Sequence, residues 1–86
     1  MNFTINADGV LEKAALEGKA KVVVPDGVVR IGDFAFEGCE GLTSIVITEG
    51  VVAIGVHAFR GCTALEKAVI YDSVEDIGEG AFDGCS

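Results

Sequence analysis

The stretch that decides the fold is PDGVVRIGDFAFEGCEGLTSIVI, residues 25–47, followed by TEGVVAIGVHAFRGCTALEKAVI, residues 48–70, and YDSVEDIGEGAFDGC, residues 71–85. The three segments share one period of 23 residues. The clearest repeating columns are Val28, Val51 and Val74; Ile31, Ile54 and Ile77; Phe36, Phe59 and Phe82; and Cys39, Cys62 and Cys85. A fixed period of this size is typical of a solenoid, in which each unit stacks on its neighbour.

Each unit is expected to contain two short strands and one helical turn. The spacing L-x-x-I-x-I at Leu42, Ile45 and Ile47 ends in an alternating, β-branched stretch, which predicts a strand. A turn follows at residues 48–50, and V-x-x-I-G then predicts a second, shorter strand. The string A-F-x-G-C predicts a helical turn closed by a glycine in the left-handed conformation.

These strings, together with residues 19–24, resemble the BspA-like class of leucine-rich repeat over residues 19–86. The resemblance implies an α/β repeat: a right-handed leucine-rich-repeat solenoid with 23-residue units, short parallel strands and single helical turns. It also implies a main parallel sheet on one side and a family often found in surface or secreted binding and adhesion proteins. Lys19 and Ala68 depart from the pattern at usually apolar positions, and Thr48 and Tyr71 stand where Pro25 keeps the common residue.

The first 18 residues are expected to form a degenerate capping unit before the solenoid of residues 19–86, within a single domain. Aligned at the same period, Asp8 stands in the isoleucine column and Lys13 in the phenylalanine column. Terminal repeats are expected to be atypical because their outer face meets water. Residues 2–11 favour a β-hairpin around Asp8 and Gly9, whereas residues 12–17 could equally form a short helix. Hairpin and helix therefore both stay open for residues 10–17.

Composition excludes several classes of partner. The net charge of −8 argues against binding to nucleic acid or to an anionic membrane. No apolar run approaches the roughly 20 residues of a membrane-spanning helix, so no membrane insertion is expected. The start, MNFTINADG, carries no signal-peptide pattern, which fits an intracellular protein or one whose leader was removed. A cell-surface or secreted location follows from the family resemblance alone.

The three cysteines are expected to be free, buried thiols. Stacked units lie about 4.8 Å apart, which a disulfide could span. The side chains should, however, point inward in parallel, and an odd count would leave one over. Three thiols in a row do not suit the tetrahedral geometry of zinc, so no metal site is expected.

No catalytic constellation is visible, and the chain is predicted not to be an enzyme and to need no cofactor. His57 shares a column with Phe34 and Gly80, which indicates a surface position, and no nucleophile stands at a fixed distance from it. Asp26, Glu49 and Asp72 form an acidic column at the turns, where calcium binding is the alternative to solvated carboxylates. The column of Glu37, Arg60 and Asp83 alternates in sign and predicts exposed ion pairs between units.

The outer, concave face of the main sheet is the candidate binding surface. Residues between the inward apolar positions must point away from the core. The candidate ligand-binding residues are Lys21, Val23, Ser44, Val46, Thr48, Lys67, Val69 and Tyr71. An apolar stripe with a polar rim can bind protein, although valines on a flat sheet also arise from β-propensity alone. The favoured function is a protein–protein interaction or adhesion module, and the alternative is a structural spacer or capping fragment of a longer array.

The C-terminal end predicts self-association. The strand around Ala68, Val69 and Ile70 has no strand after it in the printed sequence. An unpaired apolar sheet edge is a template for another chain. A homodimer through the C-terminal end is the simplest expected assembly.

Overall fold

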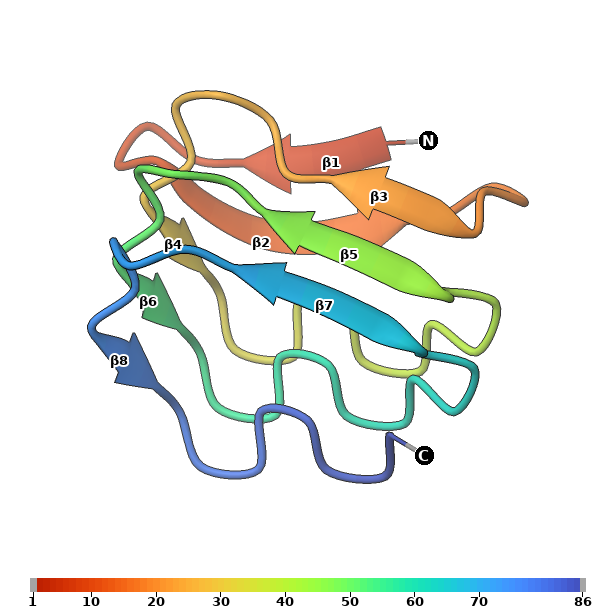
Figure 1. The fold of residues 1–86 in the computed structure, drawn as a ribbon. Helices are drawn as coiled ribbons and strands as arrows, with labels where there is room; N and C mark the ends of the chain where they lie inside the picture. Colours follow the sequence, from red (N-terminus) through yellow and green to blue (C-terminus); the bar gives the residue numbers. More distant parts are fainter. Residues whose placement is uncertain (1, 86) are drawn as a thin grey trace.

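The computed structural model describes residues 2–85, which form eight short strands and the turns that connect them. The strands are β1 (Asn2–Ile5), β2 (Val10–Ala15), β3 (Lys21–Val23), β4 (Arg30–Ile31), β5 (Ser44–Ile47), β6 (Ala53–Ile54), β7 (Lys67–Ile70) and β8 (Asp76–Ile77). They make a three-stranded sheet in the order β3-β5-β7 and a five-stranded sheet in the order β1-β2-β4-β6-β8. Successive units lie one below the other (Figure 1).

The pairing of both sheets follows the sequence period. In the three-stranded sheet Lys21 pairs with Ser44 and Ser44 with Lys67, both parallel and 23 residues apart. In the larger sheet Ile31 pairs with Ile54 and Ile54 with Ile77, again in parallel. The predicted short parallel strands are therefore confirmed.

The core lies between the two sheets and is built from the predicted inward columns. Ile31, Phe36, Leu42, Ile45 and Ile47 are fully buried. The phenylalanine column forms a continuous stack: the ring centroids of Phe36 and Phe59 lie 4.8 Å apart, and those of Phe59 and Phe82 lie 5.1 Å apart. Because the middle unit has a neighbour on each side, Phe59 is covered on both of its faces.

The predicted single helical turns are not confirmed, since residues 2–85 contain no helix. In the stretch that begins at Phe34, the backbone N–H groups alternate between two uses. Those of Phe34 and Phe36 donate to carbonyl oxygens of the next unit, Val56 and Ala58, whereas that of Ala35 donates to Gly32 within its own unit. Phe34 also has a positive φ of 61°, as His57 has in the next unit with 54°. A helix needs every N–H for its own backbone, and here every second one holds two units together.

The glycines that close these turns do adopt the predicted left-handed conformation. Gly38, Gly61 and Gly84 have φ values of 75°, 78° and 78°. A residue with a Cβ atom is disfavoured there, which explains why this column holds glycine in each unit.

The N-terminal segment is a β-hairpin and not a helix. Strand β1 pairs antiparallel with β2, and β2 then pairs in parallel with β4. The period of 23 breaks here, because Leu11, and not Asp8, pairs with Ile31. The Ala14 N–H donates to the carbonyl oxygen of Ala35, just as the Phe36 N–H donates to that of Ala58 one unit later. Ala14, and not Lys13, therefore occupies the position that phenylalanine has in the full units. A strand of six residues replaces the strand and turn of a full unit, which shortens the spacing.

Candidate binding face and its relatives

Three parallel strands bring the predicted candidate residues together on one surface. Their outward side chains lie in register across β3, β5 and β7, in rows that begin at Lys21 and Val23. The alternate positions Val22, Ile45 and Ile47 are buried. The side chains between them therefore point away from the core. We call this surface the strand face; its residues are Lys21, Val23, Ser44, Val46, Thr48, Lys67, Val69 and Tyr71.

The centre of the strand face is a stripe of three valines. Val23 is 60% exposed at the edge strand, and Val46 and Val69 are half-buried beside it. The stripe is flanked on one side by Lys21 and Lys67, both exposed. This arrangement offers a small apolar contact area with hydrogen-bonding and charged groups along its border.

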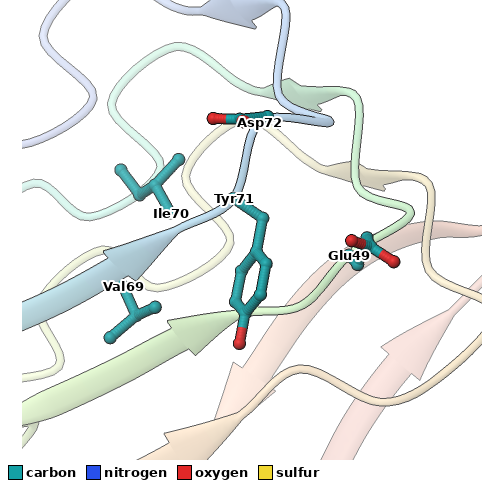
Figure 2. A pocket seen from close by; sticks show the side chains of 5 residues that line it. All are labelled: Glu49, Val69, Ile70, Tyr71 and Asp72. Atoms are coloured by element: carbon teal, nitrogen blue, oxygen red, sulfur yellow. The ribbon is translucent and has the colours of Figure 1, made fainter.

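The other side of the stripe ends at Thr48 and Tyr71. The Thr48 hydroxyl donates to the carbonyl oxygen of Val24 at 3.1 Å, so this side chain is used to tie two units together. Tyr71 is 43% exposed, and its ring extends from the end of β7 toward β5, on the same side as Val69 (Figure 2). Tyr71 is therefore an exposed side chain at the end of the valine stripe.

A hollow of about 280 Å³ lies at this corner of the sheet. It is lined by Glu49, Val69, Ile70, Tyr71 and Asp72. Sequence reasoning assigned Val69 and Tyr71 to the candidate surface and missed Glu49, Ile70 and Asp72. Ile70 shares a repeat position with the core residue Ile47, so it was expected to be buried. It borders the hollow because β7 is the edge strand of its sheet. The acidic turn column is the signal that could have found Glu49 and Asp72.

The cysteine column is asymmetric. Cys62 is fully buried, and its thiol donates to the carbonyl oxygen of Phe36 at 3.2 Å, whereas Cys39 and Cys85 are half-buried. The expectation of three buried thiols is therefore wrong for Cys39 and Cys85, because neither lies between two complete units. All three are free thiols in the structure.

The same column has unequal acidities. Interaction with the neighbouring Cys62 thiol lowers the pKa of Cys39 to about 7, with partial burial acting against it and the charge of Lys13 assisting. Interaction with Cys39 and burial raise the pKa of Cys62, and burial raises the pKa of Cys85. Cys39 is thus the thiol that ionises most easily.

The remaining candidates lie apart from one another. The His57 ring packs against the Phe34 ring in a tilted arrangement, with ring centroids 5.5 Å apart, and its Nδ1 lies 3.3 Å from the carbonyl oxygen of Gly80. Within residues 2–85 no group of three His, Cys, Asp or Glu side chains is placed to hold a metal ion. Arg60 and Glu37 form the predicted ion pair between units, at 4.0 Å and with both side chains well exposed.

The chain belongs to the family of BspA-type leucine-rich repeats. The family model, described as the BspA type leucine rich repeat region with 6 copies, matches residues 15–86. Leucine-rich repeat proteins are generally non-enzymatic binding modules. No curated protein matches the chain.

Two solved structures show the same fold. The chain is similar to a Treponema pallidum leucine-rich repeat protein with 32% identity and a TM-score of 0.83, over 96% of this chain and 42% of that one. It is similar to a leucine-rich repeat protein from Bacteroides ovatus with 30% identity and a TM-score of 0.66, over 98% of this chain and 31% of that one. The chain spans less than half the length of either protein. In the part that the structure describes, no helix is long and apolar enough to cross a membrane.

Proposed function

We propose that this protein is a non-enzymatic protein-binding module whose contact surface is the strand face. The observation that carries the proposal is the exposed valine stripe of Val23, Val46 and Val69, held rigidly by paired parallel strands. Rigid elements place binding groups more accurately than loops do. The hollow beside Tyr71 adds a recess for one side chain of the partner, and tyrosine is enriched at the sites that carry binding energy.

Further details of the proposal rest on the family. We infer a right-handed solenoid of 23-residue units, capped by residues 1–18, which the register of 23 residues in both sheets supports. We also propose an adhesive role and a surface or secreted location, for which membership of the BspA-type family is the support. The net charge of −8 supports a protein partner in preference to nucleic acid.

The test is selection of binders from a random peptide library on the intact 86-residue chain. Selected peptides should shift the amide NMR signals of β3, β5 and β7, and Val46→Asp should weaken their binding by at least about tenfold, since a buried, unpaired charge is costly at the centre of an interface. Val52→Asp is the control, because Val52 is the same residue type and 43% exposed but precedes β6 in the other sheet. Equal losses for the two variants would contradict the strand face as the contact surface.

The alternative is a structural spacer or cap without a ligand of its own. The half-buried core side chains of the last unit favour it, since Val74 and Phe82 gain full burial if another unit covers them. Insertion of a second copy of residues 48–70 after Ile70 would then raise the melting temperature, and no selected peptide would map to the strand face. A homodimer through the C-terminal end is a further proposal for that surface. Light scattering in dilute buffer should then show a dimer, and a strictly monomeric chain at high concentration would contradict it.

A further inference from the structure

The strand face lies between two rows of opposite charge. Strands β3 and β7 begin at Lys21 and Lys67, which are both exposed and which we call the lysine row. The strands lead into turns that hold Asp26, Glu49 and Asp72, all exposed, which we call the acidic row. The valine stripe lies between the two rows. Along the strands the surface therefore changes from basic to apolar to acidic.

The charges of both rows are free to contact a partner. Within residues 2–85, no side chain of either row makes an ion pair or a side-chain hydrogen bond. At the acidic end, Glu49 and Asp72 lie beside Val69 and Tyr71 (Figure 2). The acidic row therefore directly borders the apolar part of the strand face, so that one bound segment can contact both.

The exposure of the two rows is independent of what covers the edges of the sheet. Strands pair edge to edge, about 4.8 Å apart, and their outward side chains stand above and below the plane of the sheet. A strand added beside β7 would thus extend the sheet sideways and leave the outward side chains of β7 uncovered. The strand face keeps its charges in an array of any length.

We propose that the strand face binds an extended segment of another protein that has a carboxylate at one end, an apolar centre and a Lys or Arg side chain at the other end. This inference rests on the proposed function and names the chemistry of its partner. The carboxylate would lie over Lys21 and Lys67, the apolar centre over the valine stripe, and the basic side chain over Glu49 and Asp72. Complementary charges across an interface select the partner and fix its register.

The dimensions of the strand face favour a short segment that lies along the strands. Three strands about 4.8 Å apart span only about 10 Å. Lys21 and Asp26 stand five residues apart, which is about 16 Å at roughly 3.3 Å per residue. A segment of about five residues covers that length.

A second copy of this chain is the less suitable occupant. Two strand faces related by a two-fold axis could place the lysine row of one copy over the acidic row of the other. The footprint of the face is, however, far smaller than the roughly 800 Å² per partner that a stable interface buries. A short segment needs no more than this footprint.

Four short peptides with blocked termini test the proposal by NMR titration of the intact chain. The mixed peptide ETVTK carries one charge of each sign, KTVTK and ETVTE carry two like charges, and QTVTQ carries none. The mixed peptide should shift the amide signals of β3, β5 and β7 and bind at least about threefold more tightly than KTVTK. Its affinity should fall as salt is added. If the net charge of −8 governed binding, KTVTK would bind most tightly instead.

Charge reversal in the chain should change the preference among the peptides. Lys21→Glu combined with Lys67→Glu should make KTVTK the tightest binder, because both ends of the strand face are then acidic. Lys13→Glu combined with Arg30→Glu is the matched control: it changes the net charge equally, but these exposed residues lie on β2 and β4 of the other sheet. This control should leave the mixed peptide preferred. Glu66 directly precedes Lys67, so Glu66→Gln should tighten the binding of ETVTE.

Three results would overturn the proposal: equal affinity for the mixed and like-charged peptides, tightest binding of KTVTK to the unaltered chain, or binding of none of the four. In each case, library peptides that still shift the signals of β3, β5 and β7 would leave the proposed function intact, so the two failures are distinguishable. Light scattering completes the test. A dimer that Lys21→Glu and Lys67→Glu dissociate would show that a second copy occupies the strand face, which would also overturn the proposal.

Discussion

At the scale of single residues, Phe59 and Phe34 illustrate how the repeat separates core from surface. Both are phenylalanines in the same kind of turn, but Phe59 is fully buried in the ring stack and Phe34 is 42% exposed. Their columns already differ in the sequence, since the column of Phe34 also holds His57 and Gly80. Tolerance of unlike side chains marks a position that the core does not constrain.

Phe59→Ala is therefore expected to be among the most destabilising single changes. Loss of a buried phenylalanine costs about 3–5 kcal/mol, a large part of the roughly 5–15 kcal/mol that stabilises a domain. Phe34→Ala should cost far less. Urea unfolding of the two variants measures the difference, and equal midpoints would show that the column assignment is wrong.

Cys39 should be the thiol that reacts first in the folded protein. Because the thiolate is the nucleophile and the pKa of Cys39 is lowered to about 7, its alkylation by iodoacetamide should rise with pH through about 7 and be lost below it. Cys62 should stay protected until the protein unfolds. Mass spectrometry after brief labelling identifies the modified residue.

The variant Cys62→Ala serves as the control, since it removes the thiol whose interaction lowers the pKa of Cys39. The midpoint of alkylation should then move to higher pH. An unchanged midpoint would mean that Lys13 alone accounts for the acidity. In denaturant all three cysteines should react, as expected for free thiols.

At the scale of elements, the backbone of each turn lies almost against the next. A Cβ atom built on Gly55 would stand 2.6 Å from the backbone nitrogen of Asp33 and 2.7 Å from the carbonyl carbon of Gly32. Close packing between units, and not a special φ value, therefore explains why glycine occupies this column at Gly32, Gly55 and Gly78.

Gly55→Ala should destabilise the protein by about 1–3 kcal/mol, the usual cost of overpacking. Gly41→Ala is the matched control, because nothing in the described structure lies within 4 Å of the added atom. Its effect should stay within about 0.5 kcal/mol. Urea midpoints of both variants provide the comparison, and a neutral Gly55→Ala would contradict the close contact.

The elements also show how far the sequence alone can lead. Alternation of β-branched residues predicted the strands and their outward faces, because period-two burial is a local property of the chain. The helical turns were not confirmed, because the decisive hydrogen bonds, such as that from the Phe36 N–H to the Ala58 carbonyl oxygen, join residues of different units. The hollow beside Tyr71 was only half predicted, since Ile70 borders it through its place at a sheet edge. The period of 23 did not predict that Leu11 pairs with Ile31, because β2 continues as a strand where a full unit has a turn.

At the scale of the whole molecule, the acidic turn column raises the question of calcium. Asp26, Glu49 and Asp72 lie at successive turns and are all exposed. Exposed carboxylates that are free to turn toward water do not form the six- to eight-oxygen cage that calcium prefers, about 2.3–2.6 Å from each ligand.

The melting temperature should therefore be unchanged by chelator, and added calcium should act no differently from another salt of equal ionic strength. Calorimetry with calcium and with magnesium measures both responses. A saturable rise specific to calcium that Asp72→Asn abolishes would assign a site to the turn column.

The N-terminal hairpin has a consequence for how the chain reaches this structure. Strands β1 and β2 pair residues within one stretch of 2–15, whereas the pairings of the repeats join residues 23 apart. Closing a short loop costs less entropy than closing a long one, and isolated hairpins form within about 1–10 μs. The hairpin is then the first surface on which a unit can condense, and each unit becomes the template for the one after it. The molecule would thus assemble from its amino end, in the order in which a ribosome delivers it.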